Sequence, residues 1–207
     1  MSTPAPPRSR RLVRGRSDVV LLVTGAVVLV LAALPVNPVR VSGPEAAVFR
    51  VVNGTTVLPF VLVWSVMQLG NALVIPAAAL VAAVLRRWWL AAELLLAGAG
   101  TYLLAKEVKH VATRGRPHAL LPDVVIRGAE AYGLGFVSGH AAVLAALSAV
   151  AWPWLGRAGR IAVCALVVVV SLTRLYVGAH LPLDVVGGVG LGLAVGGAVR
   201  LLMGRPR

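Results

Sequence analysis

The sequence predicts an all-α membrane protein: one bundle of six transmembrane helices with both termini in the cytoplasm. Of its 207 residues, 59% are hydrophobic and 13% are charged, whereas soluble domains carry about 25% charged residues. The apolar residues also gather in long runs, and a helix needs about 20 of them to cross the hydrocarbon core of a bilayer. An ordinary soluble enzyme is therefore excluded, and the lipid bilayer is the first expected partner.

Six apolar runs are candidate spans. They lie near Val19 to Pro35, Ser65 to Leu85, Trp89 to Val108, Ala141 to Leu155, Ile161 to Val177 and Leu183 to Met203. Each is expected to be helical, because backbone polar groups inside a bilayer must bond to one another. Several runs are short and depend on neighbouring helices. In the last run, glycines recur every four residues at Gly188, Gly192 and Gly196, which favours close helix packing.

The placement of the arginines sets the expected orientation. Twelve of the 20 basic residues fall before the first run, between the second and third, between the fourth and fifth, and at the end of the chain. These are Arg8, Arg10, Arg11, Arg14, Arg16, Arg86, Arg87, Arg157, Arg160, Arg200, Arg205 and Arg207. With six spans they share one side, which the positive-inside rule assigns to the cytoplasm. The net charge of +13 is thus expected to meet lipid head groups and not nucleic acid.

This orientation divides the chain into a basic cytoplasmic tail (1–18), a single domain in the plasma membrane (19–203) and a basic cytoplasmic end (204–207). Residues 37–64 are the long external connection. Within it, the segment that starts at Ser42 and continues Gly-Pro-Glu is typical of a helix start. The apolar face of that helix is expected to lie along the outer leaflet. Its residues are Val48, Phe49, Val51 and Val52.

The informative polar residues gather in three short segments, 109–117, 137–140 and 173–184. All three fall at the outer ends of the expected spans. Because side chains from the same end of a bundle can meet, the segments predict one polar site that faces the outside of the cell.

The residues in these segments suit the capture of a phosphate group. Lys109, Arg116 and Arg174 can neutralise non-bridging oxygens, and a guanidinium offers a planar pair of donors to a tetrahedral anion. Ser138 is a natural N-cap, so the amides that follow it would start a helix and bind an anion. Gly139 lets the backbone approach that anion closely.

Two histidines can divide the chemistry of phosphate-ester cleavage. His180 lies one helical turn before Asp184, whose carboxylate can accept a ring N–H and orient the imidazole. His180 is therefore the expected nucleophile. His140, beside the phosphate-binding amides, is expected to protonate the leaving oxygen and then to activate water. The sequence contains no cluster of metal ligands, so neither a metal nor another cofactor is expected.

These residues resemble the signature of the type 2 phosphatidic acid phosphatase family. The family pattern is a lysine, six residues and Arg-Pro; then Pro-Ser-Gly-His; then Ser-Arg, five residues, His, three residues and Asp. The matching residues here are Lys109, Arg116, Pro117, Ser138, Gly139, His140, Arg174, His180 and Asp184. The sequence departs at Val137, where the family usually has proline, and at Thr173, where it usually has serine.

The resemblance implies a six-helix membrane bundle, a phosphohistidine intermediate and metal-independent hydrolysis of a lipid phosphate or diphosphate. Vanadium haloperoxidases share similar site residues, but they are soluble. The substrate stays open among undecaprenyl diphosphate, phosphatidate and phosphatidylglycerol phosphate. The polyprenyl carrier is slightly preferred, because an external site suits its recycling. A lipid phosphotransferase with the same site and a non-catalytic binder or transporter of lipid phosphates are the alternatives. The oligomeric state is not predicted.

Three charged residues outside the pattern have simpler expected roles. Arg114 and Arg127 are expected on a solvated loop face. Glu93 lies inside the third expected span near its cytoplasmic end, where a charge is costly, and its carboxylate is expected to extend toward the head groups.

Overall fold

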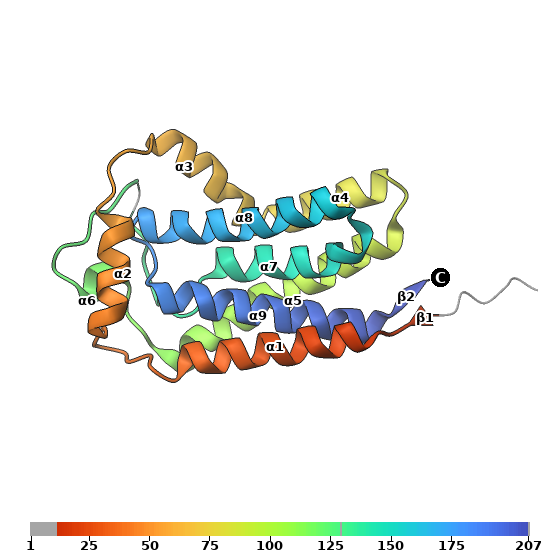
Figure 1. The fold of residues 1–207 in the computed structure, drawn as a ribbon, viewed down its shortest axis with the longest axis horizontal. Coiled ribbons are helices and arrows are strands. Elements are labelled where there is room, and N and C mark those ends of the chain that lie inside the picture. Colours follow the sequence, from red (N-terminus) through yellow and green to blue (C-terminus); the bar gives the residue numbers. More distant parts are fainter. Residues whose placement is uncertain (1–11, 129, 207) are drawn as a thin grey trace, which may run out of the picture.

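The computed structural model describes residues 12–128 and 130–206, and it is all-α apart from one short strand pair (Figure 1). The helices are α1 (Arg16–Ala33), α2 (Gly43–Asn53), α3 (Phe60–Met67), α4 (Val74–Val84), α5 (Trp88–Ala112), α6 (Pro117–Leu120), α7 (Gly139–Ala151), α8 (Arg157–Tyr176) and α9 (Pro182–Met203). The 3-10 turns are η1 (Gln68–Gly70) and η2 (Trp152–Trp154). The predicted basic tail falls mostly on residues 1–11, which lie outside the described part.

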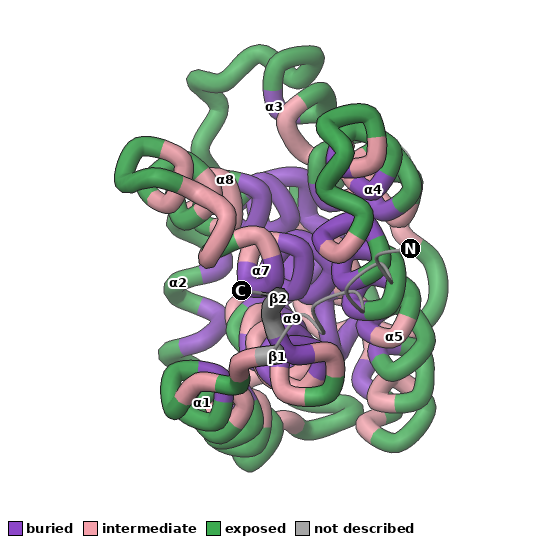
Figure 2. Tube along the Cα trace, turned by 90° about the vertical axis from the view of Figure 1, so that its right-hand side faces the viewer, coloured by how far each residue is buried: buried purple, intermediate pink, exposed green. Residues whose placement is uncertain are grey.

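Helix α7 forms the centre of the bundle. Nine of its 13 residues are buried and the other four are half-buried, and α5, α8 and α9 pack around it while α1 lies along α9 (Figure 2). The predicted close packing of α9 is confirmed, because a Cβ on Gly188, Gly192 or Gly196 would collide with atoms of α7 or of Ser138 directly before it. On its opposite face α9 meets α1, where Gly190 is equally crowded by Leu29. Small residues therefore let α9 fit between two helices.

Four helices are long and apolar enough to cross a membrane, within the residues described. These are α1, α5 extended through α6, α8 and α9. The second expected span is not one straight helix. In this part of the chain, residues 60–70 and 74–84 form two helical pieces that meet at an angle of 67°. Asn71 is extended there, and its side chain accepts a hydrogen bond from the Leu73 amide, which interrupts the helix. With this bent pair as one span, the number of candidate spans is five.

The fourth expected span, Ala141 to Leu155, is also shorter than predicted. Helix α7 has 13 residues, which corresponds to about 20 Å. It ends before η2, where Pro153 lacks the amide that would continue the helical hydrogen bonds. Because α7 is enclosed by other helices, protein side chains and not lipid cover most of its surface.

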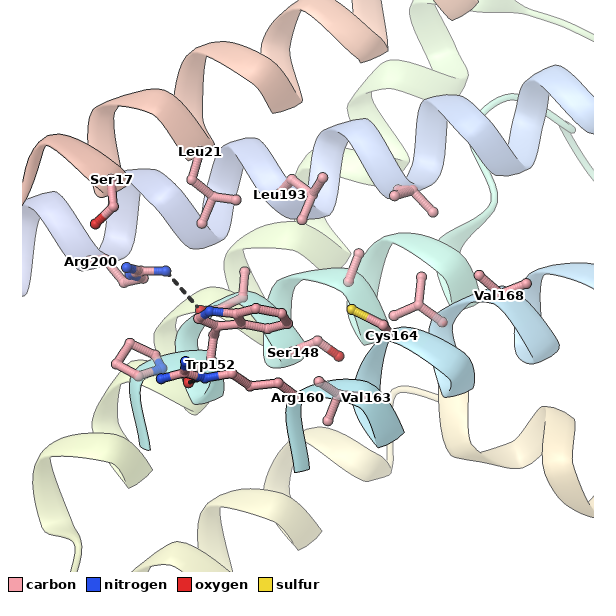
Figure 3. Close-up of a pocket in the computed structure, with 15 residues that line it drawn as sticks. Ser17, Leu21, Ser148, Trp152, Arg160, Val163, Cys164, Val168, Leu193 and Arg200 are labelled. Atoms are coloured by element: carbon pink, nitrogen blue, oxygen red, sulfur yellow. Dashed lines mark hydrogen bonds between the residues drawn. The ribbon is translucent and has the colours of Figure 1, made fainter. Parts of the chain in front are cut away.

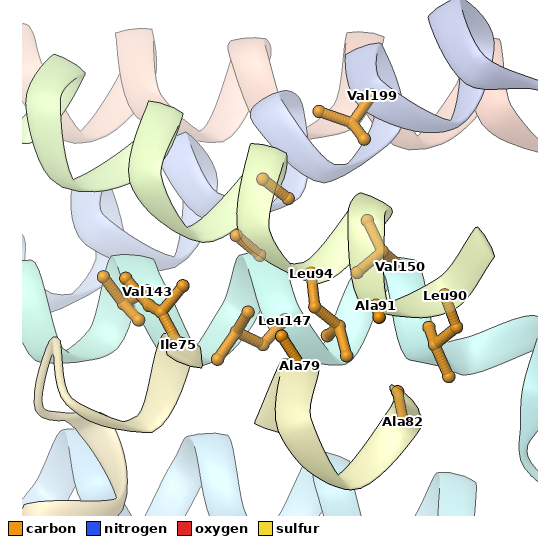
Figure 4. Packing of buried hydrophobic residues seen from close by; sticks show 12 residues of the cluster. Ile75, Ala79, Ala82, Leu90, Ala91, Leu94, Val143, Leu147, Val150 and Val199 are labelled. Carbon is orange, nitrogen blue, oxygen red and sulfur yellow. The ribbon is translucent and has the colours of Figure 1, made fainter. Parts of the chain in front are cut away.

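The main hydrophobic core joins α4, α5 and α7 on one side of the bundle. Its larger side chains include Ile75, Leu94, Val143, Leu147 and Val150 (Figure 4). Helix α5 also carries Glu93, which is 1% exposed, and the Trp154 indole donates to its carboxylate at 3.4 Å. The expectation that Glu93 extends to the head groups is therefore wrong: its side chain is buried against the protein, where the half-buried Trp154 of η2 donates to it.

The two ends of the bundle differ in character. The described chain begins and ends at one end of the bundle, where the antiparallel strands β1 (Leu12–Val13) and β2 (Arg205–Pro206) pair beside the starts of α1 and α8 and the turn from α4 to α5 (Figure 1). We call this the arginine end, because most of the described arginines of the four predicted groups lie there. Helices α2 and α6 lie at the opposite end (Figure 1).

Helix α2 begins as predicted, since the Ser42 side chain accepts a hydrogen bond from the Glu45 amide at 3.4 Å. Its expected membrane face is only partly right. Val48 and Val51 are exposed, but Phe49 is fully buried and packs on Leu175 and Leu181. The helix therefore covers the end of α8, the start of α9 and the polar residues beneath them.

Candidate active site

The three predicted polar segments meet beneath helix α2. The first lies at the end of α5, the second at the start of α7, and the third spans the end of α8 and the start of α9. Backbone hydrogen bonds join them directly: the Ser138 amide donates to the Asp184 carbonyl at 2.8 Å, and the Gly135 amide donates to the Arg114 carbonyl at 2.7 Å. The predicted convergence of the segments thus has a physical basis in the backbone itself.

His180 lies in the short loop between α8 and α9 and is 2% exposed. Its Nε2 is 3.0 Å from a terminal guanidinium nitrogen of Arg116, and its Nδ1 is 3.4 Å from Oδ2 of Asp184. Because a guanidinium can only donate, Nε2 must be the acceptor of the first contact. The ring proton therefore belongs on Nδ1, facing Asp184, and the lone pair of Nε2 faces Arg116.

The surroundings of His180 also favour its neutral form. Burial lowers the pKa of His180 well below 6.5, and the nearby charges of Arg116, Arg174 and Lys109 lower it further. Both effects oppose a positive charge on the ring. A neutral imidazole with an unprotonated Nε2 is the form that can act as a nucleophile.

Asp184 is fully buried in the first turn of α9, where its side chain is held from two sides. Oδ2 accepts a hydrogen bond from the Leu181 amide at 2.9 Å, which caps the helix, and Oδ1 accepts one from Arg114 at 3.0 Å. The i, i+4 relation to His180 predicted from the sequence thus places the carboxylate beside Nδ1. The carboxylate has little freedom to turn away.

The prediction that Arg114 lies on a solvated loop face is wrong. Its side chain is 0% exposed and lies between two carboxylates. Its terminal nitrogens donate to Glu45 at 2.6 and 3.0 Å and to Asp184 at 3.0 Å. Glu45 also accepts the Leu183 amide at 3.1 Å. Arg114 therefore joins helix α2 to the first turn of α9, which carries Asp184.

Arg127 is half-buried and also departs from the prediction. It donates to the Thr55 carbonyl at 2.8 Å and lies 4.1 Å from the centre of the Tyr176 ring. It ties the loop before α7 to the connection after α2 and to the end of α8. Its role is to hold this end of the protein together.

Three cations at the site form no ion pair within the described part of the chain: Lys109, Arg116 and Arg174. Lys109 donates to the carbonyls of Leu134 and Gly135, both at 3.0 Å. Arg116 donates to the Ala179 carbonyl at 2.7 Å and to the Tyr132 carbonyl at 3.2 Å. The two neighbouring carboxylates, Glu45 and Asp184, are engaged by Arg114. The site therefore has an excess of positive charge that an anion would neutralise.

Arg174 lies in the last turn of α8 and is 7% exposed. One terminal nitrogen contacts the sulfur of Met67, next to the break between α3 and α4. Its backbone carbonyl accepts the amides of Ala179 and His180. The same residue thus shapes the loop that carries His180 and brings a guanidinium to it.

The start of α7 has the features expected of an anion site. Ser138 is the N-cap residue, but the predicted capping hydrogen bond is missing: its Oγ is buried and has no hydrogen-bond partner among the described residues. A Cβ built on Gly139 would meet no atom within 4 Å. Space therefore lies in front of the first amides of α7, next to a hydroxyl that can donate. An oxyanion there would satisfy both.

His140 follows in the first turn of α7 and is half-buried. Gly70 packs directly behind it, because a Cβ at position 70 would come within 2.9 Å of the His140 Cβ. The His140 ring is close enough to His180 to affect its titration. The break between α3 and α4 thus supports the second histidine.

The fold and the site define a class: a helical membrane protein whose cations, helix-start amides and two histidines lie together at one end of the bundle. The chain belongs to the PAP2 superfamily, which its residues 86–207 match. This stretch contains every residue of the predicted site, and the family is one of membrane lipid phosphatases. No curated protein matches the sequence.

Two solved structures share the fold. The crystal structure of LpxE from Aquifex aeolicus has a TM-score of 0.71 and 23% sequence identity, covering 76% of this chain and 95% of that one. The crystal structure of a transmembrane PAP2 type phosphatidylglycerolphosphate phosphatase from Bacillus subtilis has a TM-score of 0.66 and 22% identity, covering 88% and 94%. At these identities the likeness concerns the fold.

Proposed function

We propose that this protein is a metal-independent phosphatase that hydrolyses a membrane lipid phosphate or diphosphate through a phosphohistidine. The observation that carries the proposal is the geometry of His180. Its Nδ1 faces Asp184, its Nε2 is unprotonated, and cations without acidic partners surround it. This combination suits an imidazole that attacks phosphorus while the charge on the phosphoryl oxygens is neutralised.

In the first step, Nε2 of His180 attacks phosphorus and the bond to the leaving oxygen breaks. Lys109, Arg116 and Arg174 hold the phosphoryl oxygens together with the first amides of α7 and Ser138. Arg116 would then transfer its hydrogen bond from Nε2 to one of those oxygens. His140 gives a proton to the leaving oxygen, which belongs to a lipid alcohol or a lipid monophosphate. Asp184 stabilises the positive charge that develops on the His180 ring.

In the second step, water attacks the phosphohistidine. His140, now neutral, takes a proton from the water, the N–P bond breaks, and inorganic phosphate leaves. A dianionic substrate would offset most of the charge of the three cations, which removes part of their opposition to a protonated His140 at the start of the cycle. His140 is then protonated again and His180 is free and neutral, so both histidines return to their initial states after one turnover.

The arrangement of the chain in the membrane is part of the proposal. We infer six spans, with the bent α3–α4 pair as the second and the enclosed α7 as the fourth. The tail 1–18 and the end 204–207 then lie in the cytoplasm, and the domain 19–203 carries the site on its outer face. The support is that the arginines gather at the end of the bundle opposite the site.

The substrate is a lipid that carries a terminal phosphate or diphosphate. Undecaprenyl diphosphate is our first candidate, since an external site suits a carrier lipid, followed by phosphatidate and phosphatidylglycerol phosphate. The experiment is to measure phosphate released by the purified protein from these three lipids in detergent, with and without EDTA. We expect turnover of at least one lipid and no loss with EDTA. Transfer of the phosphoryl group to added alcohols with little free phosphate would instead indicate a phosphotransferase.

The pH dependence of that activity follows from His180. The nucleophile must be neutral, so the acid limb of kcat/KM, where the rate falls with falling pH, should follow the pKa of His180. Because burial and three nearby cations lower this pKa, the acid limb should lie below pH 6.5. Initial rates from pH 4 to 8 with a soluble short-chain substrate would measure it. An acid limb above pH 6.5 would contradict the neutral, cation-surrounded His180.

A further inference from the structure

A groove runs from the arginine end toward the middle of the bundle. Its volume is about 630 Å³, and α1, α7, α8 and α9 form its walls (Figure 3). It exists because α8 packs mainly on α7 and contacts α9 at only a few positions. The walls are mostly aliphatic, with Leu21, Val163, Val167 and Leu193 among them. In a bilayer such a surface faces acyl chains.

A second hollow lies along α8 itself, since all of its lining residues except Trp152 belong to this helix. It shares Trp152, Arg160, Cys164 and Val168 with the first, and the remaining lining residues include Arg157. Arg160, Cys164 and Val168 follow one another at intervals of one helical turn, so they form a ridge between the two hollows. The groove and the hollow along α8 are two apolar surfaces that meet at a common basic end, which matches the two chains and single head group of a phospholipid.

The basic end shared by the groove and the hollow carries positive charge that can bind an anion. Arg160 donates through Nε to the Trp152 carbonyl at 3.2 Å, and its guanidinium lies 5.4 Å from the centre of the Trp152 ring. Neither Arg160 nor Arg157 forms an ion pair within residues 12–128 and 130–206. Arg200, which also lines the groove, is paired with Asp18. The positive charge at the mouth therefore comes from Arg157 and Arg160.

We propose that this double groove binds an anionic phospholipid from the leaflet at the arginine end. Its phosphate would lie at Arg157 and Arg160 beside the Trp152 ring, and its two chains would lie on either side of the ridge at Cys164 and Val168. Cys164 is one turn, or about 6 Å, beyond Arg160 along α8, so it would meet the first carbons of the chains. The site is independent of the proposed reaction at the other end.

The test is a competition between two lipids that differ in charge. The purified full chain is stripped of lipid in detergent and mixed with equal amounts of dioleoyl phosphatidylglycerol and dioleoyl phosphatidylcholine, and native mass spectrometry counts the lipids retained. We expect about one phosphatidylglycerol per chain. In the double variant R157Q/R160Q the preference for phosphatidylglycerol should fall by about tenfold or more, because each basic residue near an anionic lipid contributes roughly a fivefold factor.

The matched control is R86Q/R87Q, which removes two charges at the same end but lines neither hollow; it should keep the preference. C164W fills the groove without changing its charge and should lose both lipids. Cys164 is the only cysteine and is exposed, so its alkylation by N-ethylmaleimide reports occupancy and should slow with phosphatidylglycerol.

Equal retention of the two lipids by the unaltered protein, or an unchanged preference in R157Q/R160Q, would overturn the proposal. Protection of Cys164 that rises with protein concentration in the absence of lipid would also overturn it, because a second copy of the chain would then occupy the groove.

Discussion

Replacing His180 with asparagine is expected to reduce phosphate release by about 1,000-fold or more, because the proposed covalent step loses its only nucleophile. Asparagine keeps a polar atom near Asp184 and fits in the same buried space. The measurement is the initial rate of phosphate release from the best lipid of the substrate panel. The melting temperature of the variant in the same detergent shows whether its fold is retained.

His140 provides the contrasting variant. With alanine at position 140, the attack by His180 can still occur on a substrate with a good leaving group, such as p-nitrophenyl phosphate. Dephosphorylation should be slow, because no group takes the proton from water. The variant should therefore accumulate an acid-labile, alkali-stable phosphate on the protein, and H180N should accumulate none. Full turnover by H180N, or phosphate trapped on another residue, would exclude the proposed nucleophile.

The sequence predicted those parts of the site that are local. His180 and Asp184 lie one helical turn apart, and Ser138 precedes an apolar run, so spacing alone placed the carboxylate beside the ring and the amides at a helix start. The common side of the three segments followed from the apolar runs between them. Each of these inferences depends on residues within a few positions of one another, or on a pattern along the whole chain.

The sequence did not predict contacts between distant segments. Arg114 was expected in solvent because its partner, Glu45, lies 69 positions earlier in a separate helix. The signal available was weak: a second arginine two positions before Arg116, and Glu45 as the only acidic residue in the sequence of the connection 37–64. The break in the second span was missed for a similar reason, because Gly70 packs against His140, a residue that lies 70 positions later.

Replacing Arg114 with methionine is expected to have the largest effect on stability. The variant leaves Glu45 and Asp184 buried next to each other without their shared cation. Breaking a buried ion pair from one side costs about 3–5 kcal/mol, so the melting temperature in detergent should fall markedly. Lysine at the same position should recover little, because an ammonium cannot reproduce the bidentate contact with Glu45. The matched control is R50M, which removes an exposed arginine from α2 and should change the melting temperature little.

A second substitution separates the two roles of Arg114. In R114M/E45Q one buried carboxylate becomes neutral, and the glutamine can still accept the Leu183 amide. This double variant should regain part of the lost stability, since fewer buried charges lack a partner. Its activity should stay low, because Asp184 still lacks the donor that holds it beside Nδ1 of His180. If activity returns together with the melting temperature, Arg114 only supports the fold; if stability returns alone, Arg114 positions the carboxylate that orients His180.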